Sequence, residues 1–126
     1  MKKRYFSFVI IVNKKKIMQF ANLTKDFHPL HSNASFAKKR GFKNIVAHGL
    51  LISSICSAIM YKFLGNSYFI ISQSFEYMKP VYLGEKIKIH GAYSLKNKLL
   101  KLGEIEVKVK KNKELKSRGT ILIRKF

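Results

Sequence analysis

The sequence predicts an α+β fold in which a curved antiparallel β-sheet wraps around one long buried helix. Three observations lead to this prediction. Nearly every position from Gly49 to Phe63 is apolar or small, which is typical of a buried helix. Only segments with strand character follow that run. The chain has 126 residues, of which 47% are hydrophobic and 13% aromatic, and this suits a single domain (residues 1–126) with a core of its own.

The part of the chain before the long helix is predicted to hold one strand and two short helices. Residues 5–12 are rich in aromatic and β-branched side chains, which favours a strand. Residues 14–23 space their apolar side chains as a short amphipathic helix does. A second short helix is expected over residues 34–40, where Gly41 closes it.

The long helix and the strands after it make up the rest of the chain. A helix that is apolar almost all round must be buried, and its length of roughly 22 Å is too short for a bilayer. The four strands are expected at residues 67–77, 84–95, 99–110 and 115–124, with turn residues at Pro80, Gly84, Asn97 and Asn112. No internal repeat, linker or low-complexity segment is visible.

The net charge of +20 admits two interpretations. One is nucleic-acid binding. The other is that lysines cover the solvated face of a sheet, and the alternation of lysine with apolar residues over 86–89 and 107–110 indicates the second. Because none of the usual nucleic-acid motifs is present, we expect no nucleic-acid partner.

Cysteine usage and the N-terminus indicate the compartment. The single cysteine, Cys56, excludes an internal disulfide and a multi-cysteine metal site, and we expect an inert core thiol in a reducing compartment.

Met1 to Arg4 and the apolar residues after them look superficially like a secretory signal. The apolar part is short, and lysines follow it at 14–16, so we expect no signal peptide. No apolar run is long enough to span a membrane. We therefore predict a cytoplasmic protein with no membrane partner.

One carboxylate and three histidines are candidates for proton transfer. Asp26 is the sole carboxylate in the first 75 residues, and His28, His31 and His48 lie within the next 22 positions. Such groups can act as a general acid and base when they come within hydrogen-bond reach. The alternative is that Asp26 caps a helix and the histidines are merely exposed. Pro29 stops a helix and pushes His28 towards extended geometry. With Pro29 between two of the histidines and no further ligands nearby, we expect no metal site.

The start of the long helix is a second candidate site. The first N–H groups of a helix are unpaired and carry partial positive charge, so the amide of Gly49 could polarise a carbonyl oxygen. Gly49 could equally be there only to relieve crowding. His48 is favoured as a cap or a core histidine over a direct catalytic role. Ser54 and Ser57 either contact a substrate or are present because they are small.

These motifs resemble the MaoC-like (R)-specific enoyl-CoA hydratases. The matching residues are Asp26-Phe27-His28-Pro29-Leu30-His31, Ala34, Phe36-Ala37, Gly41-Phe42, Ile45-Val46-Ala47-His48-Gly49-Leu50-Leu51, Ser74-Phe75, Lys79-Pro80-Val81 and Gly84-Glu85. The similarity runs in register from about residue 17 to residue 125. One departure stands out, because the family usually has Asn where this chain has His28.

The resemblance implies a hot-dog fold, a homodimer with active sites at or near the subunit interface, and hydration of trans-2-enoyl thioesters. It implies that Asp26 and His31 activate the water and that the Gly49 N–H binds the thioester oxygen. His28 and His48 could contact water or substrate, and the acyl chain would run along the helix past Ser54, Ser57 and Met60. The substrate is carried by coenzyme A or acyl carrier protein, no separate cofactor is needed, and the positive charge would attract either carrier.

Two other functions remain open from the sequence. A hot-dog thioesterase would use the same helix but direct water to the thioester carbon, often with a carboxylate on or near the helix. Residues 48–64 contain no carboxylate, which counts against it. A non-catalytic acyl-thioester binding protein is the third possibility, and His28 is the only observation that favours it.

Overall fold

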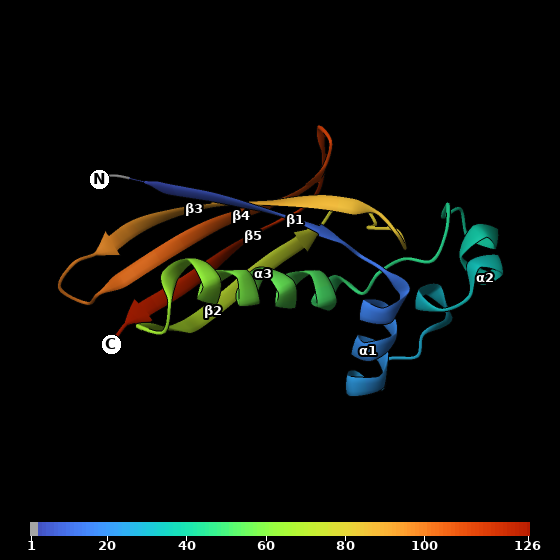
Figure 1. Ribbon diagram of the computed structural model, residues 1–126, viewed down its shortest axis with the longest axis horizontal. Helices are drawn as coiled ribbons and strands as arrows, with labels where there is room; N and C mark the ends of the chain where they lie inside the picture. Colours follow the sequence, from blue (N-terminus) through green and yellow to red (C-terminus); the bar gives the residue numbers. More distant parts are fainter. Residues whose placement is uncertain (1–2) are drawn as a thin grey trace.

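The computed structural model describes residues 3–126 and has one five-stranded antiparallel sheet that curves over a long helix (Figure 1). Its elements are, in order, β1 (Arg4–Ile11), α1 (Lys14–Thr24), the short 3-10 helix η1 (Pro29–His31), α2 (Ala34–Lys39), α3 (Gly49–Leu64), β2 (Tyr68–Tyr77), β3 (Lys86–Asn97), β4 (Leu102–Lys111) and β5 (Glu114–Lys125). The strand order is β1-β3-β4-β5-β2. The predicted α+β class and curved sheet are therefore confirmed.

The three central strands alternate between buried and exposed side chains. In β3, Ile87 and Ile89 are buried and Lys88 is exposed, and the pairs Ile89–Val109 and Tyr93–Ile105 lie opposite each other in β3 and β4. Such alternation follows from the two-residue period of a strand. Lys88 in β3 and Lys108 in β4 lie on the outer, solvated face of the sheet, as the sequence indicated.

Helix α3 buries one face against the concave side of the sheet. Ile52, Cys56 and Met60 are fully buried among the inward-facing residues of the sheet, while Leu50 is 67% and Tyr61 62% exposed. The expectation of a helix buried on all sides is thus wrong for the single chain. Five strands cover only one side of a helix, so the opposite apolar face remains open. Burial raises the pKa of the Cys56 thiol to about 12, and this thiol is therefore unreactive.

The strands β3 and β4 begin later than predicted, because their first predicted residues lie in turns. Gly84 lies in the turn before β3 with a φ of 84°, which favours glycine. Gly84 was predicted both as a turn residue and as the first residue of a strand; the turn is confirmed, and the strand begins at Lys86. Leu99, which the sequence placed in a strand, lies in the turn before β4 and is 91% exposed. Boundaries of this kind depend on local turn geometry that an apolar pattern does not reveal.

The short helices gather at the N-terminal end of α3 (Figure 1). Asn13 caps α1 by accepting a hydrogen bond from the Lys16 N–H at 3.0 Å, and Asn33 caps α2 in the same way. The segment between α1 and α2 contains η1, which begins at Pro29, because the first position of a helix is where proline is best tolerated. Among residues 3–126, no helix is long and apolar enough to cross a membrane.

A buried lysine ties β5 to the segment between β2 and β3. Lys116 is only 4% exposed, and its ammonium group donates to the Pro80 carbonyl at 2.8 Å. It also lies 2.9 Å from a Glu114 carboxylate oxygen and 3.5 Å from one of Glu85. Burial alone would raise the pKa of Glu85, but hydrogen bonds from Lys111 and the Tyr82 N–H, together with the charge of Lys116, hold it below its usual value.

Candidate active site

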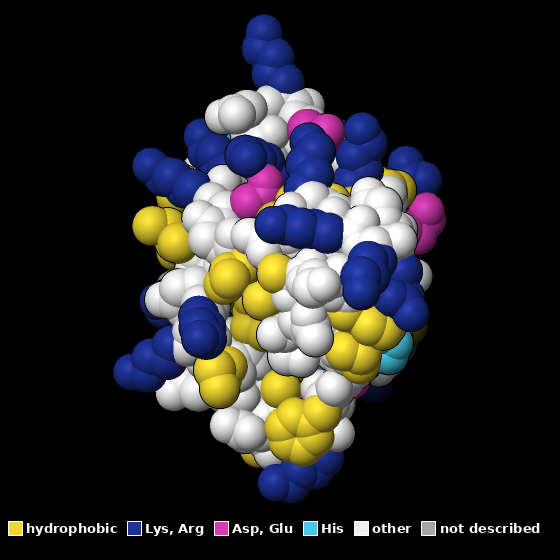
Figure 2. All heavy atoms as spheres, turned by 90° about the vertical axis from the view of Figure 1, so that its right-hand side faces the viewer, with side chains coloured by type: hydrophobic (Ala, Val, Ile, Leu, Met, Phe, Trp, Pro, Cys, Tyr) yellow, Lys and Arg dark blue, Asp and Glu magenta, His cyan; other side chains and the backbone are white. Residues whose placement is uncertain are grey.

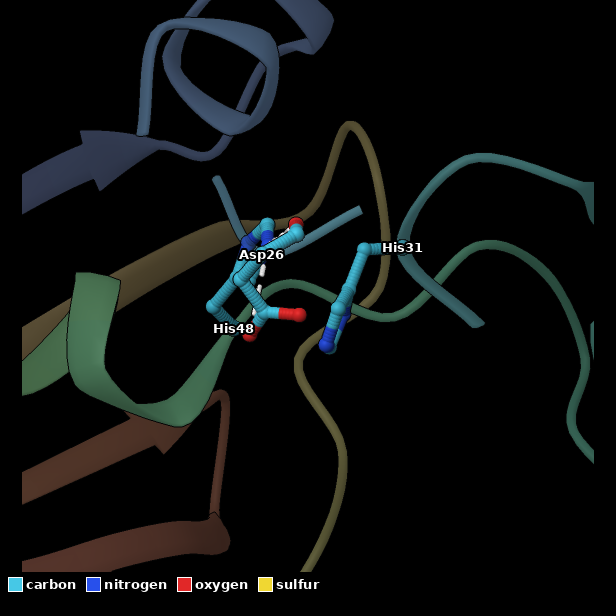
Figure 3. Close-up of side chains that lie close together, drawn as sticks. All are labelled: Asp26, His31 and His48. Carbon is cyan, nitrogen blue, oxygen red and sulfur yellow. Dashed lines mark hydrogen bonds and ion pairs between the residues drawn. The ribbon is translucent and has the colours of Figure 1, made fainter. Parts of the chain in front are cut away.

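Asp26, His31 and His48 come together beside the start of α3, from three different segments (Figure 3). Asp26 follows α1, His31 ends η1, and His48 directly precedes α3. One ligand atom from each residue lies within 4.8 Å of the other two. The imidazole rings of His31 and His48 are stacked, with centroids 3.7 Å apart and planes at 25°. The carboxylate and imidazole that the sequence singled out therefore do meet.

His31 is held by a backbone carbonyl and left with one free ring nitrogen. Its Nδ1 lies 2.6 Å from the Val46 oxygen, which can only accept, so Nδ1 carries the proton and Nε2 has a lone pair. Burial lowers the pKa of His31 below its usual 6.5, and the nearby His48 ring lowers it further. The Val46 hydrogen bond and Asp26 raise this pKa, but less than the other effects lower it. His31 is thus a neutral base at neutral pH.

The carboxylate of Asp26 is half exposed and lies on the loop after α1, which hydrogen bonds hold in place. One of its oxygens accepts from the His28 N–H at 3.3 Å, and the other lies 3.9 Å from the Nε2 of His48. The backbone carbonyl of Asp26 is closer still to that nitrogen, at 3.1 Å. The carbonyl can only accept, so His48 donates from Nε2 and holds the loop against α3.

In both His48 and His28, one ring nitrogen forms a hydrogen bond with a backbone group. His48 is buried, makes no side-chain cap to α3, and its Nδ1 has no partner within the described residues. Its side chain lines none of the cavities described below, and the predicted contact of His48 with water or substrate stays a prediction. His28 caps η1, with its Nδ1 accepting from the Leu30 N–H at 3.1 Å. An asparagine oxygen could accept at a helix start too, so His28 does not disrupt the loop.

Gly49 begins α3 beneath an aromatic ring. As the first helical residue it has an N–H without an intrahelical acceptor. A Cβ on Gly49 would lie 2.9 Å from Cε2 and Cζ of Tyr77, closer than real contacts allow. The positive φ values among glycines belong to other positions, so the residue is not required here for its backbone freedom. The crowding explanation that the sequence left open is supported, and it is compatible with an open amide.

A cavity of about 340 Å³ connects His31 with Gly49. Most of its remaining wall is apolar, formed by Phe42, Val46, Ala47, Ile52, Met78, Pro80 and Val81. Asp26 does not line this cavity but a smaller one of about 80 Å³ that His31 also lines. His31 therefore stands between the carboxylate on one side and the glycine on the other.

The predicted acyl-chain residues separate into two groups. Ser54 and Ser57 line a second groove of about 550 Å³, between α3 and β2. Met60 is fully buried in the core and lines none of the described cavities, so the expectation of a direct chain contact there is wrong in this arrangement. The helix turns Met60 towards the sheet, three residues on from Ser57.

The stacked geometry of the two histidines disfavours a metal ion among the three clustered residues. The lone pair of an imidazole nitrogen lies in the plane of its ring, and ligands to one ion must point their lone pairs at a common centre. The face-to-face rings of His31 and His48 point theirs side by side. In addition, the His31 Nδ1 is committed to the Val46 carbonyl. The cluster is better suited to moving a proton than to holding a cation.

A curved antiparallel sheet over one long helix, with an Asp/His loop at the start of that helix, defines a hot-dog protein. The sequence matches the family described as the MaoC-like domain over residues 2–115. The chain belongs to that family.

Solved structures and curated relatives agree with this assignment. The (R)-hydratase of Aeromonas caviae, described as involved in PHA biosynthesis, has a TM-score of 0.92 over 100% of this chain and 97% of its own, at 19% identity. A protein of Archaeoglobus fulgidus has a TM-score of 0.90 over 100% and 80% of the two chains, at 25% identity. These likenesses confirm the hot-dog fold.

Two relatives carry names that describe an activity. A mitochondrial 3-hydroxyacyl-[acyl-carrier-protein] dehydratase of Arabidopsis thaliana is 32% identical over 77 residues, which is 61% of this chain and 46% of that protein. An (R)-specific enoyl-CoA hydratase of Aeromonas caviae is 32% identical over 73 residues, 57% and 54% of the two chains. The matched region thus spans about half the length of these curated relatives.

Proposed function

We propose that this protein is a hydratase/dehydratase that interconverts trans-2-enoyl and (R)-3-hydroxyacyl thioesters. One observation carries the proposal: the imidazole of His31, a neutral base with a lone pair on Nε2, lines both a small cavity shared with Asp26 and a larger, mostly apolar cavity shared with Gly49. Family membership and the names of the relatives favour the same chemistry.

In the proposed reaction, His31 takes a proton from water as the water oxygen bonds to C3 of the enoyl group. The Asp26 carboxylate stabilises the imidazolium that forms. Electron density moves through C2 to the thioester oxygen, which accepts a hydrogen bond from the Gly49 N–H. The proton then passes to C2, so that hydroxyl ends on C3 and hydrogen on C2. Dehydration is the same path in reverse.

The proposed carrier is coenzyme A or acyl carrier protein, and the chemistry needs no further cofactor. Figure 2 shows the end of the molecule to which the α3 N-terminus points, where Lys and Arg side chains spread around a group of apolar ones. Lys79 is at the wall of the cavity itself. Positive charge there would attract the phosphates of the coenzyme or an acidic protein. A cytoplasmic location is also part of the proposal, and the single free, buried thiol suits it.

The proposal includes a homodimer. The open face of α3 exposes Leu50 and Tyr61, and β2 is an edge strand with Phe69 and Ile71 more than 40% exposed. An unpaired strand edge beside an apolar helix face is suited to pairing with a second copy. We expect sedimentation equilibrium to give twice the 14.6 kDa of one chain. A Tyr61→Glu variant should shift the mass towards one chain, and a wild-type mass of one chain would contradict this expectation.

The activity is tested by adding the protein to crotonyl-CoA and following enoyl absorbance and free thiol together. We expect enoyl absorbance to fall with no release of thiol. Thiol release without loss of the enoyl group would instead indicate a thioesterase. Tight binding with no turnover would indicate a non-catalytic acyl-thioester binding protein. Either of these two results would overturn the proposed reaction.

The lowered pKa of His31 predicts the acid side of the pH profile. A base works when unprotonated, so the midpoint of the acid-side fall in kcat/KM for hydration should lie below pH 6.5. The unfolded chain binds this proton at about pH 6.5, so the contribution of His31 to stability is lost as pH falls below that value. A pH profile of kcat/KM measures the first effect. A midpoint above pH 6.5 would contradict the assignment of His31 as the base.

A further inference from the structure

Tyr77 stands between the two cavities on either side of the α3 N-terminus. The first contains His31 and Gly49, and the second contains Ser54, Ser57 and Gln73. Tyr77 lines both. It is the last residue of β2, the edge strand beside α3.

A hydrogen bond holds the ring of Tyr77 in this place. The Tyr77 hydroxyl donates to the Ser53 Oγ at 3.1 Å. The Ser53 hydroxyl donates in turn to the Leu50 carbonyl at 3.2 Å. Ser53 is buried and belongs to α3, so the bond fastens the ring to the helix. The ring also packs over the Cα of Gly49, where a Cβ would have no room. The remaining surface of Tyr77 is open, with 47% of the residue exposed.

We propose that Tyr77 sets the acyl-chain length of the substrate by closing the first cavity off from the second. This inference rests on the proposed function. With the thioester oxygen at Gly49 and C3 beside His31, a short chain stays within the first cavity. A longer chain has to pass the Tyr77 ring to enter the groove, whose walls include Leu50 and Phe75. In the proposed dimer this groove lies at the interface, where a second copy would shield the chain from water.

Three variants separate the ring from its hydroxyl. Tyr77→Ala removes the ring and joins the two cavities. Tyr77→Phe keeps the ring but removes the bond to Ser53, and Ser53→Ala removes the same bond from the other side. Tyr5→Ala is the matched control, because Tyr5 is 72% exposed on β1 at the opposite edge of the sheet. Circular dichroism and thermal unfolding show which variants are folded.

The experiment measures kcat/KM for trans-2-enoyl-CoA substrates of four to ten carbons. It also measures Kd by calorimetry for butyryl-CoA and octanoyl-CoA, which cannot be hydrated. We expect the eight- to four-carbon ratio of kcat/KM to rise about tenfold or more in Tyr77→Ala, mainly through KM, since pocket contacts with a few methylenes discriminate on this scale. The ratio of octanoyl to butyryl affinity should rise in parallel. Tyr77→Phe and Ser53→Ala should shift both ratios about two- to fivefold and by similar amounts, and they decide the question if Tyr77→Ala does not fold.

The two readouts keep this inference apart from the proposed function. Ratios that stay at the wild-type value in every folded Tyr77 and Ser53 variant would overturn the role of Tyr77, even if hydration is fast. If the wild type hydrates no enoyl thioester but the affinity ratio shifts as expected, the role of Tyr77 stands and the proposed reaction fails. Absence of acyl-CoA binding in all variants would overturn both.

Discussion

Replacing Asp26 with Asn, or His31 with Ala, should lower kcat/KM for crotonyl-CoA hydration on the order of 10²–10⁴-fold. Each change removes one half of the pair that handles the proton of water. The asparagine side chain would keep the size of the carboxylate but could not stabilise the imidazolium of His31. The loss of enoyl absorbance measures the rate, and the fold should be retained because the Asp26 side chain is half exposed.

The double variant and a matched control make this result specific. Because the two groups act on the same proton, the double variant should lose little more than the worse single variant. His90→Ala removes an imidazole from β3, outside the candidate site, and should leave the rate within about twofold of the wild type. Full activity in either Asp26→Asn or His31→Ala would contradict the assigned roles.

Replacing Lys116 with Met should lower the free energy of unfolding at pH 7 by about 3 kcal/mol, because it removes one of the two lysines that neutralise Glu85 and the donor to the Pro80 carbonyl. The Glu85 carboxylate would keep the ion pair with Lys111 and the hydrogen bond from the Tyr82 N–H, and the Pro80 carbonyl would lose the Lys116 donor. Urea unfolding followed by circular dichroism measures the difference.

The pKa of Glu85 is lowered in the fold, so its stabilising contribution is present above its unfolded pKa and is lost as pH falls below that value. The difference in the free energy of unfolding between the wild type and Lys116→Met should therefore shrink at low pH.

Lys79→Met is the matched control for this prediction. Lys79 also pairs with Glu114, at 3.2 Å, but its side chain is 58% exposed. An exposed ion pair contributes little because water screens it and both side chains lose freedom. The stability of Lys79→Met should therefore stay close to that of the wild type. Equal losses in Lys79→Met and Lys116→Met would show that burial is not what makes Lys116 important.

The sequence predicted the layers of the fold because its patterns are local. The alternation of lysine with apolar residues in β3 and β4 marks the two faces of the sheet, and the apolar run of α3 marks the helix beneath it. The exposure of Leu50 and Tyr61 could not be predicted in this way. It depends on how much of the helix five strands can cover, which is a property of the assembled sheet.

The candidate site was predicted only in part for the same reason. Asp26 and His31 stand five residues apart in one loop, so a motif can reveal them. The stacking of His31 on His48 joins residues 17 positions apart. The lowered pKa of His31 follows first from its burial, which no motif encodes. Tyr77 was missed altogether. An aromatic residue at the end of a strand carries no signal that it will lie over Gly49.

The central claim is that Asp26, His31 and the Gly49 amide act on one thioester, and a crystal structure of Asp26→Asn with bound (R)-3-hydroxybutyryl-CoA tests it most directly. We predict that the thioester oxygen lies within hydrogen-bond distance of the Gly49 nitrogen, and the C3 hydroxyl within that distance of the His31 Nε2. A ligand whose C3 hydroxyl lies away from His31, or whose thioester oxygen contacts another donor, would contradict the claim.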